Sequence, residues 1–228
     1  MNYFLAILLA VCTLACGGGS SSSNKSTGLN VTLDKSSLSF ISLGPGVTSE
    51  NVQATMTGGQ GTYYLSVVST SSNYQILATL NITSSTNGSM AFSLDPSHGF
   101  LIGNEDSTLT LALCSDPALS NKVWSTTLPV HIHIFLPNPS DVSLSSTTGG
   151  TTVSTSVSLS AVDSGGLVQA TVSGSPWLTC TRTDASNFSV SANPTGLLPG
   201  TYQGTIQLSA GGASTEVPVT FSVSGTGS

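Results

Sequence analysis

Apolar and polar residues alternate with a period of two along most of the chain after residue 28. The clearest runs are residues 153–161 (VSTSVSLSA) and 205–209 (TIQLS), in which Val, Ile and Leu alternate with Ser, Thr and Gln. Such alternation places the apolar side chains on one face of a strand, and Val and Thr favour the pleated conformation. The pattern therefore predicts strands rather than helices, which would show an apolar period of 3.6 residues.

Turn-forming pairs interrupt these runs at short intervals. They are Gly58-Gly59, Asn87-Gly88, Gly149-Gly150, Pro199-Gly200 and Gly211-Gly212. Several short strands separated by such turns are typical of a β-sandwich. We therefore expect an all-β protein.

The strand pattern occurs twice. Each half ends on an apolar residue, a proline and a further alternating run: LPVHIHI at 128–134 and VPVTFSV at 217–223. Upstream of these runs, further blocks match in the same order: FSLDP at 92–96 with FSVSANP at 188–194, and LTL at 109–111 with IQL at 206–208. We expect two tandem immunoglobulin-like β-sandwich domains at 29–136 and 141–228, the second with a short polar tail. The proline-containing segment 137–140 is the linker between them.

The two prolines of the matching end strands also carry a prediction. Pro129 and Pro218 lack a backbone N–H, so we expect each to lie near the start of its strand, where that loss is tolerated.

The second copy carries motifs that can be compared with a family. These are SPWLT at 175–179, NPTGL at 193–197, PGTYQGTI at 199–206 and VPVTF at 217–221. In order and spacing they resemble the BACON domains, a family of bacterial immunoglobulin-like sandwiches, over roughly residues 141–224. The first copy looks like a diverged relative, with NEDS at 104–107 in place of PGTY and only a loose counterpart of the Trp-Leu motif in YYL at 63–65.

The resemblance implies a cell-surface module that binds carbohydrate, such as a glycan or mucin. Sugar binding needs a flat aromatic face with polar groups beside it, and Trp177 and Tyr202 are the candidates. Both residues also suit packing at the edge of a sandwich, and this is the interpretation that we favour for each. The alternative function is a non-catalytic structural or adhesive spacer that contacts other proteins. Exposure of Trp177 separates the two hypotheses.

The N-terminus resembles a bacterial lipoprotein signal. An apolar run that is too short to span a bilayer ends at Cys16, and a Gly/Ser-rich stretch follows it. We expect residues 1–15 to be removed, Cys16 to be lipidated, and residues 16–28 to form a tether to a membrane surface. Gly17 after the cysteine favours an outer membrane where the host has one. The alternative is an ordinary signal peptide cut after Ala15, which would release a soluble protein.

Charge is scarce in this chain. Only 6% of residues are charged, the net charge is −6, and the chain has four basic residues. No basic patch can form that would neutralise a phosphate backbone, so we expect no nucleic-acid partner. No segment after Cys16 combines helical apolar spacing with Lys or Arg, so we expect membrane contact only through the lipid anchor. A glycan or a surface protein remains as the possible partner.

The remaining reactive residues give weak signals. Cys114 and Cys180 fall in different halves and within apolar strand patterns, so buried free thiols are the simplest interpretation, with an inter-domain or inter-chain bridge as the alternative. His131 and His133 share one strand face opposite Ile132 and Ile134, without a visible third metal ligand.

Four carboxylates could approach one another near the loops of the first domain, but their spacing fits no known calcium loop. They are Asp95, Glu105, Asp106 and Asp116. No nucleophile elbow, zinc-protease helix or phosphate-binding loop is present in the sequence. We therefore expect no metal, no cofactor and no enzymatic activity.

Overall fold

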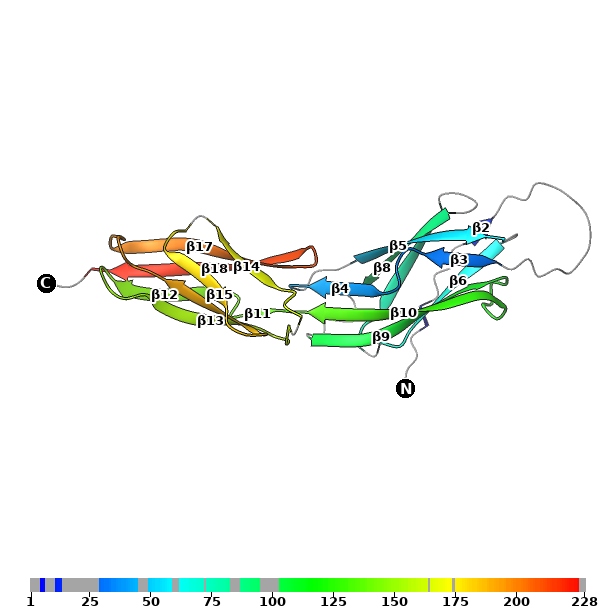
Figure 1. Cartoon of the computed structure of the whole chain (residues 1–228), viewed down its shortest axis with the longest axis horizontal. Helices are drawn as coiled ribbons and strands as arrows, with labels where there is room; N and C mark the ends of the chain where they lie inside the picture. Colours follow the sequence, from blue (N-terminus) through cyan, green and yellow to red (C-terminus); the bar gives the residue numbers. More distant parts are fainter. Residues whose placement is uncertain are drawn as a thin grey trace, which may run out of the picture. The chain divides into compact units, whose positions relative to one another are not determined.

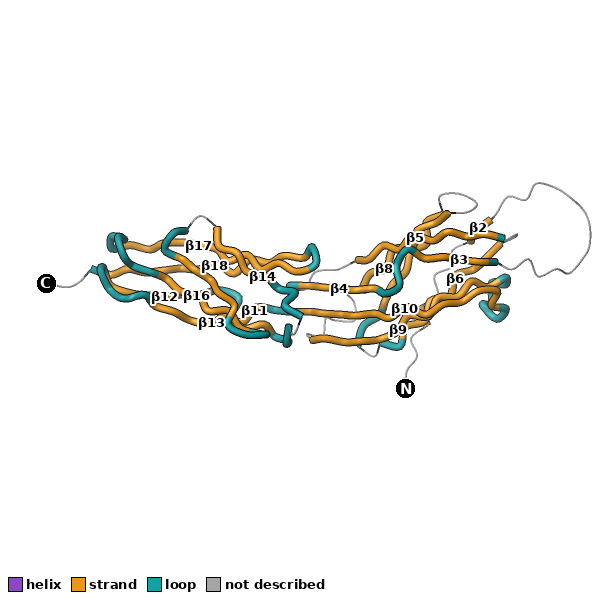
Figure 2. The backbone as a smooth tube through the Cα atoms, in the orientation of Figure 1, coloured by secondary structure: helices purple, strands orange, loops and turns teal. Residues whose placement is uncertain are grey.

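The computed structural model describes residues 5–6, 11–13, 29–44, 49–58, 62–71, 73–82, 87–94, 103–163, 165–173 and 175–225. Every regular element within these ranges is a β-strand (Figure 2), which confirms the prediction of an all-β protein. Among the described residues no helix is long and apolar enough to cross a membrane. Cys16 and the predicted tether at 16–28 lie outside the described residues.

The chain groups into two compact units. The first consists of Met1–Phe40, Val47–Leu101 and Glu105–Ile132, and the second of Ile41–Gly46, Ile102–Asn104 and His133–Ser228. The second unit thus takes in two short segments from the half predicted as one domain at 29–136. Leu43 and Phe135 explain part of this grouping, because both are buried in the second core and Phe135 N donates to Ser42 O at 2.9 Å.

The first unit contains strands of two sheets (Figure 1). One sheet has the order β3 (Asn30–Leu33), β5 (Ser49–Thr57), β8 (Asn87–Leu94) and β7 (Ile76–Ile82). The other has the order β6 (Thr62–Ser69), β9 (Gly103–Cys114), β10 (Lys122–Ile134) and β4 (Leu38–Ser42). The short strands β1 (Leu5–Ala6) and β2 (Val11–Thr13) pair with β6. β4 and β10 end, and β9 begins, in residues that group with the second unit.

The first core follows the alternation that the sequence predicts. On β10 the residues Leu128, Val130 and Ile132 are buried, while the residues between them are more exposed. Phe40, Phe92, Leu109 and Leu111 are among the other fully buried side chains. Burial of such side chains supplies most of the favourable free energy of folding in a sandwich of this kind.

The second unit is a sandwich of two four-stranded sheets. One sheet has the order β11 (Pro137–Asn138), β13 (Val153–Leu159), β16 (Asn187–Ala192) and β15 (Leu178–Arg182). The other has the order β12 (Val142–Thr147), β18 (Ala213–Ser224), β17 (Gly200–Ala210) and β14 (Gln169–Ser173). The described strand pairs of this unit are antiparallel except that of β12 with β18, which is parallel.

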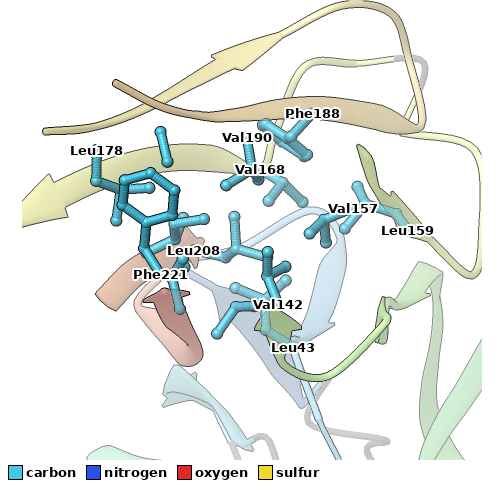
Figure 3. Close-up of a cluster of buried hydrophobic side chains, with 14 of the residues drawn as sticks. Leu43, Val142, Val157, Leu159, Val168, Leu178, Phe188, Val190, Leu208 and Phe221 are labelled. Carbon is cyan, nitrogen blue, oxygen red and sulfur yellow. The ribbon is translucent and has the colours of Figure 1, made fainter. Parts of the chain in front are cut away.

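Inward side chains of both sheets form the second core (Figure 3). Val142 from β12, Val157 from β13, Val190 from β16 and Phe221 from β18 are buried together there. The outward positions of the same strands are mostly Ser and Thr, such as Ser154 and Ser191, whose hydroxyl oxygens lie 2.8 Å apart. Hydroxyl groups therefore solvate faces that charged residues cover in most proteins.

The prediction for the two strand prolines was wrong. β10 begins at Lys122 and β18 at Ala213, so Pro129 and Pro218 both lie well inside their strands. For Pro218 the register gives the reason. β12 pairs with β18 only from Val219 onward, so Pro218 has a strand partner on one side alone, at Thr205. A missing N–H is tolerated at such an edge.

Candidate functional site

Trp177, the first predicted sugar-binding residue, lies in the core of the second unit. Its side chain is 8% exposed. The indole stacks on Phe221, with ring centroids 5.4 Å apart and planes inclined by 26°. The centroid of the Tyr202 ring lies 6.3 Å from that of the indole, and the two planes are tilted by 58°. The Trp177 side chain therefore does not offer a flat aromatic face to solvent.

Local structure holds Trp177 in this position. A turn precedes it, closed by Leu178 N donating to Ser175 O at 3.0 Å, and Asn193 N donates to Trp177 O at 2.8 Å. These bonds fix the backbone at the start of β15, so the indole points between the sheets.

Tyr202, the second predicted residue, is half-buried on β17. Its hydroxyl donates to the carbonyl oxygen of Leu198 at 2.8 Å. This bond holds the loop at 193–200 against the strand that follows it. The phenol thus has a structural partner, and only part of the ring surface faces water.

The loop at 193–200 is ordered by its own polar groups. Thr195 N donates to Asn193 Oδ1 at 3.0 Å, and Leu197 N donates to Pro194 O at 3.0 Å. Leu197 packs against the core, whereas Leu198 is 75% exposed. The loop presents the apolar side chains of Leu198 and Pro199 and no charged group.

Aromatic side chains elsewhere in the described residues are also withdrawn from solvent. None of them is fully exposed, and Tyr64, Trp124 and Tyr202 are the half-buried ones. Sugar recognition through a stacked pyranose needs an accessible ring face. Within the described ranges, these three half-buried rings offer the largest accessible aromatic surfaces.

A polar cluster that the sequence did not predict lies where β13 connects to β14. Asp163 is 3% exposed, and its carboxylate accepts hydrogen bonds from Leu167 N (2.8 Å) and Val168 N (2.7 Å). Arg182, on β15, donates from both Nη atoms to Asp163 Oδ2 at 3.0 Å. Its guanidinium lies 5.3 Å from the centre of the Phe188 ring.

The electrostatics of this cluster are those of a structural clamp. Burial by itself raises the pKa of Asp163, but the hydrogen bonds from Val168 N, Leu167 N and Arg182 outweigh it, so the pKa is lowered. Arg182 also donates to four carbonyl oxygens, those of Asp163, Val168, Asp184 and Ala185. The carboxylate is charged and fully engaged, so it is poorly suited to move a proton.

The two histidines lie where the sequence predicts, on the outward face of β10, and each has a neighbour on β9. His131 Nδ1 is 2.7 Å from Asp106 Oδ1, and His133 Nδ1 is 3.0 Å from Asn104 Oδ1. In the part of the chain that the structure describes, no group of three His, Cys, Asp or Glu side chains could hold a metal ion.

The four carboxylates considered for calcium do not gather. Asp95 lies outside the described residues. Glu105 and Asp106 are near the start of β9, whereas Asp116 follows its end, about 30 Å away at the usual strand rise. Asp116 instead shapes its own turn by accepting bonds from Ser120 N (3.1 Å) and Asn121 N (2.6 Å).

Cys114 and Cys180 are free, as the simplest interpretation predicted. Cys114 is buried and Cys180 half-buried. Burial raises the pKa of the Cys180 thiol to about 11 and also raises that of Cys114. Both thiols are therefore protonated at neutral pH and are poor nucleophiles.

The first unit contains a small apolar cavity of about 30 Å³. Its lining comes from both sheets of that unit and carries side chains such as Ala54 and Met56 from β5, Tyr63 from β6 and Trp124 from β10. Such a cavity holds no water-binding group and is expected to be dry.

Comparisons with known proteins add likenesses of shape. No protein-family model and no curated protein matches the chain. Similar solved structures include an endo-fucoidan hydrolase of glycoside hydrolase family 107, 17% identical over 86% of this chain and 29% of that one, with a TM-score of 0.34. Others are the titin I-band fragment I67–I69 (10% identical, 86% and 66% covered, TM-score 0.37) and a protein of unknown function from Porphyromonas gingivalis W83 (14%, 84% and 99%, TM-score 0.31).

This chain spans less than a third of the length of the fucoidan hydrolase. The sheets themselves define its class: an all-β protein of tandem immunoglobulin-like β-sandwiches.

Proposed function

We propose that this chain is a surface-anchored, non-catalytic protein whose tandem sandwiches act as a spacer or adhesive element. The burial of Trp177 in the second core carries the proposal, because it removes the aromatic face that a sugar site would need most. The uncharged Ser- and Thr-rich strand faces suit a module that remains soluble without attracting charged partners.

Several observations support the non-catalytic part of this proposal. Asp163 is held by Arg182 and two backbone N–H groups, and Asp116 is held by its own turn. The thiols of Cys114 and Cys180 have raised pKa values. These groups are committed to structure, whereas a catalytic group needs a pKa near the working pH and a substrate within reach.

The anchor is the second part of the proposal. The N-terminal pattern that ends at Cys16 supports a bacterial lipoprotein, and the motifs at 175–221 support a relative of the BACON domains. We place the protein at the outer membrane or the cell surface. Mass spectrometry of the mature N-terminus tests the anchor directly. A lipid-modified Cys16 is expected, and a free N-terminus at that residue would show simple secretion instead.

Glycan binding is the second candidate function, and the partly accessible ring of Tyr202 favours it. The ring lies beside the loop at 193–200, which offers backbone and side-chain polar groups near Asn193 and Thr195. In this second function a sugar would contact the accessible part of the Tyr202 ring.

A glycan array separates the two candidates. The mature two-unit protein is screened beside Tyr202→Ala and Tyr202→Phe, with near-ultraviolet circular dichroism as the test of folding. No binding above background by the folded protein supports the spacer. Specific binding that Tyr202→Phe keeps and Tyr202→Ala loses would overturn the spacer proposal and establish a sugar site at this ring.

A further inference from the structure

One end of the first unit brings together the start of β3 and a strand hairpin. β3 begins there at Asn30, which pairs with Thr57 at the end of β5. The hairpin between β9 and β10 lies at the same end, since Cys114 at the end of β9 pairs with Tyr64 near the start of β6 (Figure 1). We call this the tether end, because residues 16–28 join the unit here.

The hairpin turn at the tether end contains a residue in an unfavourable backbone conformation. Asp116 caps the turn through bonds from Ser120 and Asn121, and Leu119 N donates to Asp116 O at 3.1 Å. Leu119 itself has a φ of 58°, in the left-handed region that glycine or asparagine usually occupies. A leucine at this position is unfavourable for the turn, so its side chain is a candidate for a role outside the fold.

Apolar surface surrounds this leucine. Pro117 and Ala118 precede it in the turn and are exposed, and Val123 on β10 is 40% exposed. We define Pro117, Ala118, Leu119 and Val123 as the tip patch. Leu119 itself is half-buried, and exposed apolar side chains lie on both sides of it in the sequence, which suits a contact surface.

Charge in the first unit is concentrated away from the tip patch. Among the described residues of the tether end, Asp116 and Lys122 are the charged ones, and their charges offset each other. The opposite end of the same strands carries a larger group, namely Asp34, Lys35, Glu50, Glu105 and Asp106. The tether end can therefore approach a lipid surface without a net negative charge of its own.

Chain length keeps the tip patch close to the anchor. Residues 17–28 separate Cys16 from Leu29, and a segment of this length spans at most about 45 Å even when fully extended. A patch held so near a bilayer needs little affinity of its own, because attachment keeps its effective concentration high.

We propose that the tip patch rests in the headgroup region of the membrane that holds the anchor, with Leu119 and Val123 in contact with lipid. This proposal rests on the proposed anchoring at Cys16. The partner of the patch is a lipid surface. In this proposal the apolar contact of Leu119 with that surface is the reason that a leucine occupies an unfavourable backbone position in the turn.

The test attaches the protein to vesicles without relying on lipidation. A chain that begins at Gly17, with an N-terminal hexahistidine tag, is bound to phosphatidylethanolamine and phosphatidylglycerol vesicles that contain a nickel-chelating lipid. Ala118→Trp places a reporter in the tip patch, and Leu198→Trp places a matched reporter on an exposed apolar position of the second unit. Emission is compared between plain vesicles and vesicles with brominated acyl chains.

Bromine quenching and a blue shift are expected for Ala118→Trp and not for Leu198→Trp. Adding Leu119→Gly to Ala118→Trp should abolish most of the quenching while raising thermal stability, because glycine relaxes the turn as it removes the side chain. Equal quenching of both reporters, or none in folded vesicle-bound protein, would overturn the proposal. Because the tag replaces the lipid, failure here is distinct from a failure to find lipid on Cys16.

Discussion

Gly204 on β17 leaves the space that the Trp177 indole occupies. A Cβ atom added at Gly204 would lie 3.2 Å from Trp177 Cη2 and 2.8 Å from Leu178 Cδ2. Two motifs that are separate in the sequence, SPWLT at 175–179 and PGTYQGTI at 199–206, are therefore complementary parts of one packing arrangement. The spacing of these two motifs is therefore explained by packing in the core of the sandwich, without a ligand.

Gly204→Ala should therefore destabilise the second unit. The added methyl group must displace Leu178 and the indole, and overpacking of this kind costs about 1–3 kcal/mol. Urea unfolding followed by tryptophan emission in a Trp124→Phe background, which leaves Trp177 as the reporter, measures the change. Gly165→Ala is the matched control, since its Cβ would meet Leu167 at an ordinary 3.5 Å. Equal stability of the two variants would show that the contact at Gly204 is not restrictive.

Asp163→Asn should lower the free energy of unfolding by about 3 kcal/mol at pH 7. This is the lower end of the cost of breaking a buried pair, chosen because the Arg182 side chain is 26% exposed. The folded-state pKa of Asp163 lies below its unfolded value, so its contribution is present above pH 5 and is lost as the pH falls below about 4.

The difference between wild type and Asp163→Asn should accordingly shrink on acidification. Urea titrations from pH 7 to pH 3 measure it, with Glu216→Gln, at an exposed position of β18, as the control that changes little. A difference that is constant over this range would contradict the assignment to the charged carboxylate.

Cys114 and Cys180 should resist alkylation in the native protein. With a pKa of about 11, only about one in a thousand Cys180 thiols is ionised at pH 8, and the thiolate is the reactive form. Mass spectrometry after iodoacetamide treatment should find both unmodified in buffer and both modified in urea. Rapid native labelling of Cys180 would mean that the edge strand β15 opens readily.

Ala54→Val should stabilise the first unit by about 1 kcal/mol, because the two added methyl groups enter the apolar cavity. Ala54 pairs with Gly88, which also lines the cavity and leaves room opposite it. Ala78→Val is the control: Ala78 is equally buried but does not line the cavity, so the same change should overpack the core. Thermal unfolding of both variants is followed by circular dichroism. A higher melting temperature for Ala54→Val and a lower one for Ala78→Val are expected, and a lower one for both would contradict the prediction.

The period-two pattern predicted the strands because each inward position, such as Ile132 or Phe221, is set by its own neighbours in sequence. The sequence did not decide whether Trp177 is buried or exposed, because its burial depends on Gly204, across the sandwich. The clamp between Asp163 and Arg182 was missed for the same reason: the two residues lie 19 positions apart and meet only when β13 and β15 are in place. Pro218 was misplaced because strand length depends on pairing partners rather than on local pattern.

The parallel pairing of β12 with β18 has a mechanical consequence. Six residues of each strand are in register, from Val142 opposite Val219 to Thr147 opposite Ser224. A force applied between the start of β12 and the end of β18 would pull the two strands past each other. The hydrogen bonds between them would then be loaded together in shear instead of opening one by one, so this strand pair should resist mechanical unfolding.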